Sequence, residues 1–435
     1  MKIRSYIDAS RLAHDLDRVD VGRTRRMIVG LTAILVAVTA VPPPKIAAQA
    51  PAAPHDVKVF GGASITPDPS WVHVNPGTSI QNLITQYPGA TTFYLRAGIH
   101  RRQQVRPKTD NQFIGEVGAI MDGENVTPHA FETLGGIVER VRIRRLVIRN
   151  YASPTQYGAI QGDNGFDWVV EDNVVHNNLV IGIRTGRRWR VSRNKVYRNG
   201  TIGISGFKAD GAVIEGNEVY ENNFLQAPEE PIMAEASGMK FLRGLNMVIR
   251  NNYVHHNRAK GIWIDGNYPT TIVEGNRVSD NHHAGIWIEV SFGAIVRQNL
   301  TERNGPQDKA GSLVGYAGIQ VTNSPDVQIY GNTVLDNSNG IGVMQSATPI
   351  VDATYGVLEV RNLDVHDNTV RMRIGRTGLV QIIGAPSYYT SKNNRFQNNR
   401  YYLGTNATYF AWSDTSLNET QWKAAGNDVT GTFAR

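Results

Sequence analysis

One short motif recurs along most of this chain and constrains its fold more than any other feature. The motif is Asn-x-apolar-x-x-Asn, and a β-type run such as WVVEDN or TIVEGN precedes each copy. A second run, opening with Gly as in GIRT or GIWI, follows it. Weaker copies lie at Asn150, Asn368 and Asn394…Asn399. The clear copies are Asn173…Asn178, Asn194…Asn199, Asn217…Asn222, Asn252…Asn257, Asn276…Asn281, Asn299…Asn304 and Asn332…Asn337.

A repeat of about two dozen residues with three short strands cannot bury its own apolar face, so each unit must stack on its neighbours. The sequence therefore predicts an all-β, single-stranded parallel β-helix, a solenoid. Over roughly residues 110–400 the pattern resembles the right-handed parallel β-helix of pectate-lyase-like carbohydrate enzymes. We interpret the asparagines as structural, because Asn tolerates left-handed turns and stacked amides can hydrogen-bond from coil to coil.

The predicted organisation has four parts. Residues 51–120 are expected to hold an N-terminal cap and the first coils, with a short amphipathic cap helix before the strand of TTFYLRAGIH. Residues 121–400 form the β-helix, and residues 401–435 break the repeat and form a C-terminal cap. Caps are needed because an open end of a β-helix exposes strand edges.

Residues 1–50 read as a removable export segment. Arg25 and Arg26 precede the apolar run Met27–Val41, which is too short to span a membrane, and Ala48–Ala50 resembles a cleavage site. The segment holds eight of the 45 basic and four of the 38 acidic residues, so its removal lowers the net charge from +7 to +3. We expect an exported protein, periplasmic or extracellular, with no nucleic-acid partner and no membrane association after processing.

The stretch Gly261–Val290 contains Gly-Ile-Trp-Ile-acid twice, ending in Asp265 and in Glu289. Side chains alternate along a strand, so Ile262 and Ile264 should face the core and Asp265 should point outward. The two acids are 24 residues apart, one coil of the repeat, and neighbouring strands lie about 4.8 Å apart. Their carboxyl groups should lie about 5 Å apart, the separation typical of retaining glycosidases.

The position of Trp263 and Trp287 forms a column with Lys240 on one side and Gln320 on the other. We expect both indoles on an exposed wall, where they suit the apolar face of a sugar, or else packed beneath inserted loops. Lys240 is either paired with Asp265 or available to substrate. Three inserts should border this patch as walls of a groove: Asn223–Ser237, Gly305–Ala317 and Gln345–Glu359.

Histidines occur in pairs at corresponding turns, His255-His256 and His282-His283. Zinc requires three or four converging ligands, and the acid column offers only two carboxylates for calcium, so no metal or other cofactor is predicted. His282 and His283 instead are expected to contact substrate or a carboxylate. The absence of Cys excludes disulfides and thiolate chemistry.

The Trp-acid stretch is similar to the catalytic region of β-helical retaining glycosidases, the β-xylosidases of glycoside hydrolase family 120. That resemblance implies Asp265 as nucleophile and Glu289 as general acid/base, although Trp287 and the VSF after Glu289 depart from it. The predicted substrate is a polysaccharide or oligosaccharide. Two alternatives stay open: a uronate-specific polysaccharide lyase using Lys240, Arg258 or a His as base, and a non-catalytic glycan-binding protein.

Overall fold

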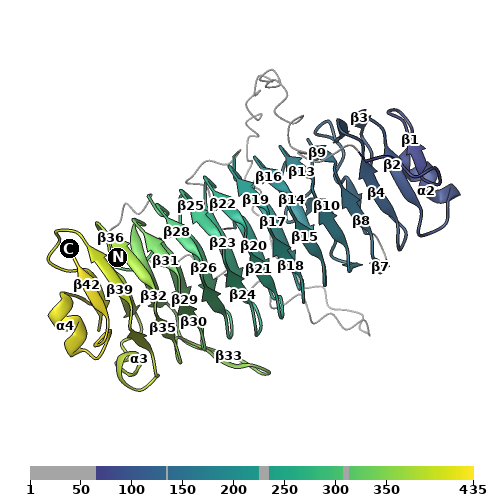
Figure 1. The fold of residues 1–435 in the computed structure, drawn as a ribbon. Coiled ribbons are helices and arrows are strands. Elements are labelled where there is room, and N and C mark those ends of the chain that lie inside the picture. The colour runs from purple at the N-terminus through teal and green to yellow at the C-terminus, as the bar shows by residue number, and fades with distance from the viewer. Residues whose placement is uncertain (1–64, 134–135, 225–234, 307–312) are drawn as a thin grey trace, which may run out of the picture. The chain divides into compact units, whose positions relative to one another are not determined.

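The computed structural model describes residues 65–133, 136–224, 235–306 and 313–435, all within the compact unit Pro54–Arg435. The predicted export segment, residues 1–50, lies outside the described residues. Within the unit the chain winds through successive coils, and each coil adds one strand to each of three long sheets (Figure 1). The strand pairs are parallel except for the hairpins β33–β34 and β40–β41. The predicted all-β parallel β-helix is confirmed.

The three long sheets are called A, B and C. Sheet A runs in the order β1 (Val72–Val74), β2 (Thr92–Leu95), β4 (Gln112–Gly115), β8 (Arg142–Arg144), β12 (Val169–Glu171), β15 (Arg190–Ser192), β18 (Val213–Glu215), β21 (Val248–Arg250), β24 (Ile272–Glu274), β27 (Ile295–Arg297), β30 (Gln328–Tyr330), β35 (Asp364–His366) and β38 (Arg395–Gln397). Sheet B runs in the order β3 (Gly98–Arg101), β5 (Ala119–Asp122), β9 (Val147–Arg149), β13 (Val174–His176), β16 (Lys195–Tyr197), β19 (Glu218–Tyr220), β22 (Tyr253–His255), β25 (Arg277–Ser279), β28 (Leu300–Glu302), β31 (Thr333–Leu335), β36 (Thr369–Met372), β39 (Arg400–Leu403) and β42 (Thr432–Ala434).

Sheet C carries the candidate site. It runs in the order β6 (Phe131–Glu132), β10 (Gly158–Gln161), β14 (Ile181–Thr185), β17 (Ile202–Phe207), β20 (Ser237–Leu242), β23 (Lys260–Asp265), β26 (Ile286–Glu289), β29 (Ala317–Thr322), β32 (Asn339–Gln345), β37 (Thr377–Gln381), β40 (Phe410–Trp412) and β41 (Thr415–Leu417). Small two-stranded sheets join β7 (Val138–Glu139) to β11 (Gly165–Phe166) and β33 (Ile350–Asp352) to β34 (Gly356–Leu358).

The core is a set of apolar columns that run from coil to coil. In sheet A the central residues of successive strands, such as Val191, Ile214 and Ile249, pair in register and are fully buried. Each buried aliphatic side chain contributes about 1.5–3 kcal/mol through removal of apolar surface from water. Because a coil alone could bury only part of this surface, stability comes from stacking.

Two asparagine ladders join the coils at the turns on either side of sheet B. In each rung an amide Nδ2 donates to the Oδ1 of the next asparagine at 2.9 or 3.0 Å, and these amides are buried. The predicted coil-to-coil amide bonding is therefore confirmed. The first ladder is Asn173, Asn194, Asn217, Asn252, Asn276, Asn299, Asn332, Asn368 and Asn399. The second ladder is Asn178, Asn199, Asn222, Asn257, Asn281, Asn304 and Asn337.

Two details of the ladders differ from the sequence-based prediction. The left-handed backbone does not fall on the ladder asparagines but on the residue before each of them, for example Asp172 at φ 57° and Asp280 at φ 57°. Asn399, which the repeat placed in the second ladder, belongs to the first, because its Oδ1 accepts from the Nδ2 of Asn368. Asn394, the first asparagine of that copy, precedes the sheet A strand β38, and Asn399 precedes the sheet B strand β39.

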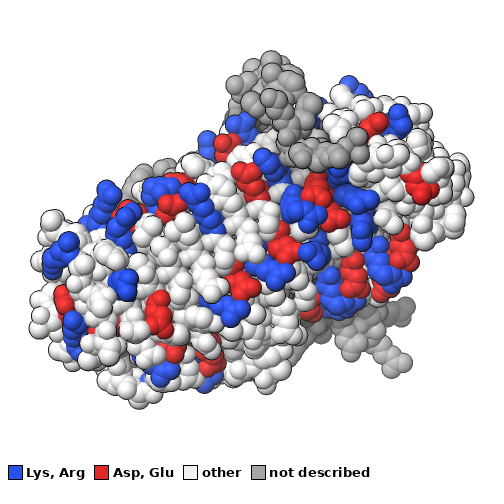
Figure 2. All heavy atoms as spheres, viewed as in Figure 1, with Lys and Arg blue, Asp and Glu red and all other residues white. Residues whose placement is uncertain are grey.

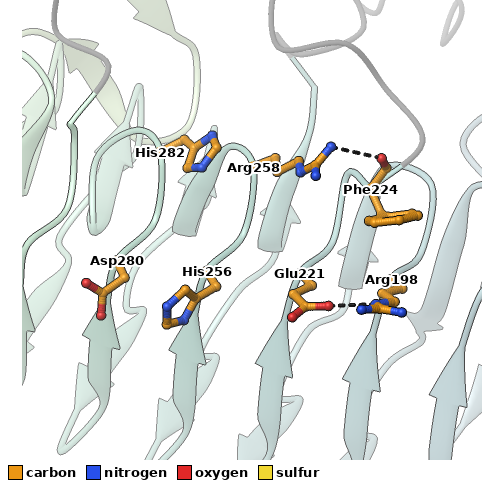
Figure 3. Close-up of a pocket in the computed structure, with 7 residues that line it drawn as sticks. All are labelled: Arg198, Glu221, Phe224, His256, Arg258, Asp280 and His282. Carbon is orange, nitrogen blue, oxygen red and sulfur yellow. Dashed lines mark hydrogen bonds and ion pairs between the residues drawn. The ribbon is translucent and has the colours of Figure 1, made fainter.

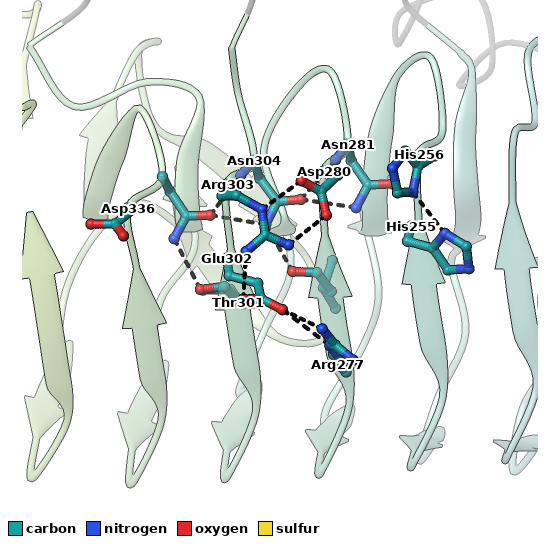
Figure 4. A network of polar contacts seen from close by, with 12 residues as sticks. His255, His256, Arg277, Asp280, Asn281, Thr301, Glu302, Arg303, Asn304 and Asp336 are labelled. Carbon is teal, nitrogen blue, oxygen red and sulfur yellow. Dashed lines mark hydrogen bonds and ion pairs between the residues drawn. The ribbon is translucent and has the colours of Figure 1, made fainter.

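Ion pairs between coils cover the outside of the turns (Figure 2). In one set the Arg303 guanidinium donates to both oxygens of Asp280 on the preceding coil and also to Glu302 (Figure 4). Basic and acidic side chains alternate over the face seen in Figure 2, so no large region of one sign marks a polyanion surface there.

Short helices lie beside the ends of the stack. Helix α2 (Ile80–Gln86) follows its N-cap Ser79, whose hydroxyl accepts from the Asn82 amide, and it lies in the segment where the sequence predicts a cap helix. Two more helices, α3 (Ser387–Thr390) and α4 (Glu419–Ala424), occur near the C-terminus, and Trp422 of α4 stacks on Phe410. The hairpin β40–β41 ends sheet C.

We expect Asn276→Ala to lower the free energy of unfolding by about 3 kcal/mol, because it leaves several buried polar groups without partners. The Asn276 amide donates to the Ile249 carbonyl and to Asn299, and its Oδ1 accepts from the backbone and side-chain nitrogens of Asn252. Urea denaturation followed by circular dichroism measures the loss. Asn82→Ala, at an exposed helical position, is the matched control and should leave stability nearly unchanged.

Candidate active site

The two Trp-acid strands are stacked in the register that the 24-residue spacing predicts. Strands β23 and β26 pair in parallel with Trp263 opposite Trp287 and Asp265 opposite Glu289. Lys240 on β20 is opposite Trp263, and Gln320 on β29 is opposite Trp287, which completes the predicted column. Ile262, Ile264, Ile286 and Ile288 belong to the main core, whereas the two indoles form a separate cluster with Ala284 on the other face of sheet C.

The indoles are buried rather than exposed, so the predicted open aromatic wall is wrong. Trp263 is 5% and Trp287 is 8% exposed, and their rings stack at 5.3 Å with 9° between planes. The Lys240 and Lys260 ammonium groups lie over the Trp263 ring at 3.6 and 4.2 Å. The His283 ring stacks on the Trp287 ring at 5.3 Å. The indoles therefore pack beneath the lysines and His283, and they cannot offer an open face to a sugar ring.

Asp265 lies at the end of β23 with one oxygen bound. Its Oδ2 is 3.0 Å from the Lys240 ammonium, which also pairs with Glu235 at the end of the 223–237 insert. Lys240 is 6% exposed, and the two carboxylates raise its pKa although burial alone would lower it. A buried lysine held between two carboxylates stays charged and fixes the orientation of Asp265.

Glu289 differs strongly from Asp265 in its surroundings. Burial first, and then the negative charge of Asp265, raise the pKa of Glu289 to about 8, against the weaker opposing effects of Lys260, Lys240 and the Trp263 hydrogen bond. The Trp263 indole Nε1 donates to Oε2 at 2.9 Å. Because Oε2 accepts that bond, Oε1 is the oxygen left to carry the acidic proton. At neutral pH the pair thus contains one protonated acid, Glu289, beside a lysine-bound Asp265.

The backbone after Glu289 is fixed in an unusual conformation. Val290 has φ 41°, in the left-handed region that β-branched residues rarely adopt, and its amide donates to the Thr322 carbonyl. The corresponding positions on neighbouring coils are Arg243, Gly266 and Asn323, which also have positive φ. The Glu289 carbonyl accepts from Gly266 and from the Ser291 hydroxyl. This turn defines where the strand ends and therefore where Glu289 stands.

Lys260 also lies at this site, although it is not among the residues predicted from the sequence. Its ammonium lies 4.2 Å from the Trp263 ring centre and 5.6 Å from that of Trp287, and the residue is 4% exposed. Burial and the nearby charge of Lys240 lower its pKa to about 7, although Glu289 opposes the shift. One signal was present: the same position on other coils holds Ile202, Ser237, Ala284 or Ala317, and a lysine stands out in that column.

Gln320 offers an unused hydrogen-bonding group. The residue is 6% exposed, and its Oε1 is buried with no hydrogen-bond partner among the described residues. Gln320 lies opposite Trp287 on the next coil. The Trp287 indole donates to the Thr322 hydroxyl at 2.9 Å and not to Gln320. An acceptor that is buried and unpartnered costs about 1–3 kcal/mol unless a ligand or water satisfies it, so Gln320 remains a substrate-contact candidate.

The two histidines predicted to contact substrate, His282 and His283, lie in different surroundings. His283 stacks on Trp287 and also lies 4.1 Å from the Tyr316 ring, and its Nδ1 accepts from the Ala284 amide. Burial, with a smaller effect of Lys260, holds the pKa of His283 far below its usual value, so this ring is neutral. His282 instead lines a cavity on the adjacent turn, and the lining of that cavity includes neither Asp265 nor Glu289.

Of the three predicted wall-forming inserts, one is described in full. In the insert 345–359, hairpin β33–β34 carries Tyr355, whose ring stacks on Tyr268 at 4.8 Å and lies 5.6 Å from Phe292. Tyr268 and Phe292 follow Asp265 and Glu289 in the chain. This insert therefore lies against the end of the site where the two acids stand. Most of the other two inserts, residues 225–234 and 307–312, lies outside the described residues.

Neither metal ligation nor a membrane span is evident in the described part of the chain. Residues 65–133, 136–224, 235–306 and 313–435 contain no cluster of three or more His, Asp or Glu side chains arranged to hold an ion. Over the same ranges no helix has the length and apolarity needed to cross a bilayer.

Comparisons with known proteins identify the fold. A family model described as a right handed beta helix region matches residues 179–354. No curated protein matches the sequence. The catalytic unit of a thermostable GH87 α-1,3-glucanase from Streptomyces thermodiastaticus is similar in structure, with a TM-score of 0.56, 12% identity, and coverage of 86% of this chain and 70% of that one.

Two other solved structures are similar to a comparable degree. A mannuronic acid specific polysaccharide family 6 lyase from human gut microbiota has a TM-score of 0.55 and 13% identity, over 83% of this chain and 91% of its own. The A-module of the Azotobacter vinelandii mannuronan C-5 epimerase AlgE4 has a TM-score of 0.51 and 14% identity, over 82% and 91%. This protein is a right-handed parallel β-helix. At these identities the likeness extends to the fold and no further.

The raised pKa of Glu289 gives a stability prediction with a defined sign. In the unfolded chain the carboxyl titrates near 4.5, and in the folded protein near 8. Its contribution to stability is present below pH 4.5 and is lost as pH rises to 8, an effect on the order of a few kcal/mol. We expect Glu289→Gln to raise the free energy of unfolding at pH 8 relative to wild type and to change it less at pH 5.

Glu302→Gln is the matched control, because Arg277 and Arg303 outweigh burial and lower the pKa of that carboxyl. The contribution of the Glu302 carboxylate to stability is present above its unfolded pKa and is lost as pH falls. At pH 8, Glu302→Gln should therefore be less stable than Glu289→Gln. Urea titrations at both pH values measure the differences. A Glu289→Gln variant that loses stability on going from pH 5 to pH 8 as steeply as wild type would contradict the assigned protonation.

Proposed function

We propose that this protein is a retaining glycoside hydrolase that acts on a polysaccharide or oligosaccharide, with Asp265 as nucleophile and Glu289 as general acid/base. The observation that carries the proposal is the carboxyl pair itself, in which one acid is held by a buried lysine and the next, one coil away, has its pKa raised to about 8. Adjacent carboxyls with unlike environments are the usual arrangement for acid and nucleophile in such enzymes.

In the first step the Asp265 carboxylate attacks the anomeric carbon of the sugar while the bond to the leaving oxygen breaks. Lys240 occupies Oδ2, so Oδ1 is the attacking atom. Glu289 donates its proton from Oε1 to the departing oxygen. The products are a glycosyl ester on Asp265 and an ionised Glu289.

In the second step Glu289 must act as a base, and the same interactions favour this change. The ester removes the negative charge of Asp265, which is the second largest cause of the raised pKa of Glu289. Glu289 therefore holds a proton less tightly in the intermediate than in the free enzyme. It can then take a proton from water as the water oxygen attacks the anomeric carbon and releases Asp265.

The comparisons and the N-terminal sequence agree with a carbohydrate substrate and export. The similar structures are a GH87 α-1,3-glucanase, a mannuronic acid specific polysaccharide lyase and a mannuronan C-5 epimerase. We extend the carbohydrate substrate to this chain on the basis of its own carboxyl pair, and we propose export on the basis of residues 1–50.

A uronate-specific lyase is the second candidate, and Lys260 is the observation that favours it. A lysine whose pKa is lowered to about 7 is partly neutral at physiological pH and can accept a proton from a carbon next to a carboxylate. Lys240 would then neutralise the uronate carboxylate. This elimination forms no glycosyl ester, so it would not require Glu289 as the acid that protonates the glycosidic oxygen.

Screening a panel of glycans identifies the substrate for the activity measurements. We expect Glu289→Gln to lower kcat/KM by about 10²–10⁴-fold and Asp265→Asn to abolish turnover. Wild-type kcat/KM should fall as pH rises through about 8, because the proton donor is lost. Reducing-end assays, with proton NMR of the first-formed anomer, measure both the rates and the retention of configuration.

Azide and ultraviolet absorbance separate the alternatives. With an activated aryl glycoside, azide should rescue Glu289→Ala with retained configuration and Asp265→Ala with inverted configuration. Glu302→Gln should remain as active as wild type. A product that absorbs in the near ultraviolet, with activity lost in Lys260→Met but kept in Glu289→Gln, would establish the lyase. Binding of glycan without any turnover would establish a binding protein.

A further inference from the structure

A cavity of about 290 Å³ lies at the turns that lead from sheet B to sheet C (Figure 3). Its lining forms two rows along the coils. The lower row occupies the left-handed position of four successive turns, and the upper row lies closer to sheet C. The lower row is Arg198, Glu221, His256 and Asp280, and the upper row is Phe224, Arg258 and His282.

The two acids that line this cavity are paired with arginines other than Arg258. Glu221 is paired with Arg198 at 2.6 Å, and Asp280 accepts from Nε and Nη2 of Arg303, which lies outside the lining (Figure 4). The Arg258 guanidinium donates from Nη1 to the Phe224 carbonyl at 3.3 Å, and no carboxylate among the described residues pairs with it. Within that part of the chain, Arg258 is therefore the cation of the cavity that lacks a carboxylate partner.

An aromatic ring fixes this guanidinium in place. The Arg258 and Arg198 guanidinium carbons lie 5.1 and 5.2 Å from the centre of the Phe224 ring. Phe224 is 39% exposed, so part of its ring remains open to a ligand. Burial, then Arg258 and His256, lower the pKa of His282, so its imidazole is neutral and can hydrogen-bond to hydroxyl groups.

The cavity and the carboxyl pair are linked through one turn of the chain. His282 lines the cavity, and the next residue, His283, stacks on Trp287 beneath the pair. Two carboxyl groups at a cleavage site disfavour an anionic ring there, whereas a cation at the turns before the strands favours it. Glu289 follows His282 by seven residues of mostly extended chain, roughly 20 Å, so a glycan that reaches both places spans several sugar units. The volume is at the small end of ligand sites and fits one sugar unit.

We propose that this cavity binds an acidic unit of the glycan substrate, with Arg258 receiving a carboxylate or sulfate group and Phe224 contacting the ring. The proposal rests on the proposed function for its statement that the same glycan reaches the carboxyl pair. It makes the substrate a glycan in which an anionic sugar lies several units from the bond that is cleaved, and not at that bond.

The test uses the full chain with Glu289→Gln, so that binding is measured without turnover. Calorimetry with glucuronate and with glucose 6-sulfate distinguishes the two anions, and glucose and inorganic sulfate are the reference ligands. We expect one acidic sugar to bind and glucose not to bind. Adding Arg258→Gln should weaken that binding at least about tenfold, as expected for loss of a charged hydrogen bond.

Arg277→Gln is the matched control, because this arginine is paired with Glu302 and lies outside the cavity, and it should leave binding unchanged. Arg258→Lys, which keeps the charge without the planar fork, should bind with intermediate affinity and covers the case in which Arg258→Gln fails to fold. Equal affinity for the acidic sugar in parent and Arg258→Gln, or equal affinity of the parent for inorganic sulfate and for the acidic sugars, would overturn the proposal. Binding as expected in a chain whose wild type hydrolyses nothing would support the cavity and reject the hydrolase.

Discussion

The register between coils is the constraint on which the rest of this molecule depends. It is held by buried asparagine amides that each bond to the next coil, so a shift of one residue would leave a whole ladder unpaired. The rigidity of that register places Asp265 directly opposite Glu289, although 23 residues separate them in the chain. The register thus stacks two carboxyl groups, and the raised pKa of Glu289 keeps one of them protonated at neutral pH.

The sequence predicts the fold and the pairing of the acids because both follow from periodicity. It does not predict what covers the indoles. Alternation assigns Trp263 to the outer face, but Lys240, Lys260 and His283 reach over the two rings from other positions. Lys260 is missed for a related reason: strict alternation from Ile262 points it into the core. At the following glycine the pairing skips a residue, from Ser237↔Lys260 to Met239↔Ile262, and the alternation breaks.

Buried indoles give this site a function for tryptophan other than sugar stacking. The Trp263 Nε1 fixes one oxygen of Glu289, and its ring faces two ammonium groups. A ring face attracts cations, so the Trp263 ring helps to stabilise both buried lysines. Lys240, which also has carboxylate partners, keeps a raised pKa, whereas that of Lys260 is lowered to about 7. The indoles thus help to create two lysines of different character.

The two proposed reactions, hydrolysis and elimination, differ in which group of the site must carry a proton. Glu289 holds it with a pKa of about 8 and Lys260 binds one with a pKa of about 7, and each charge opposes the shift of the other. A neutral sugar beside the pair leaves the proton on Glu289, which is the acid that glycoside cleavage needs. A uronate at the same place would raise the pKa of Lys260 through its negative charge and so remove the neutral base that elimination needs. The Arg258 guanidinium, at the turn that leads into β23, offers an anionic unit a position away from Lys260, where this interference does not arise. If the proposed function holds, the electrostatics of the site favour a neutral sugar at Asp265 and Glu289, with any acidic unit of the glycan bound several units away.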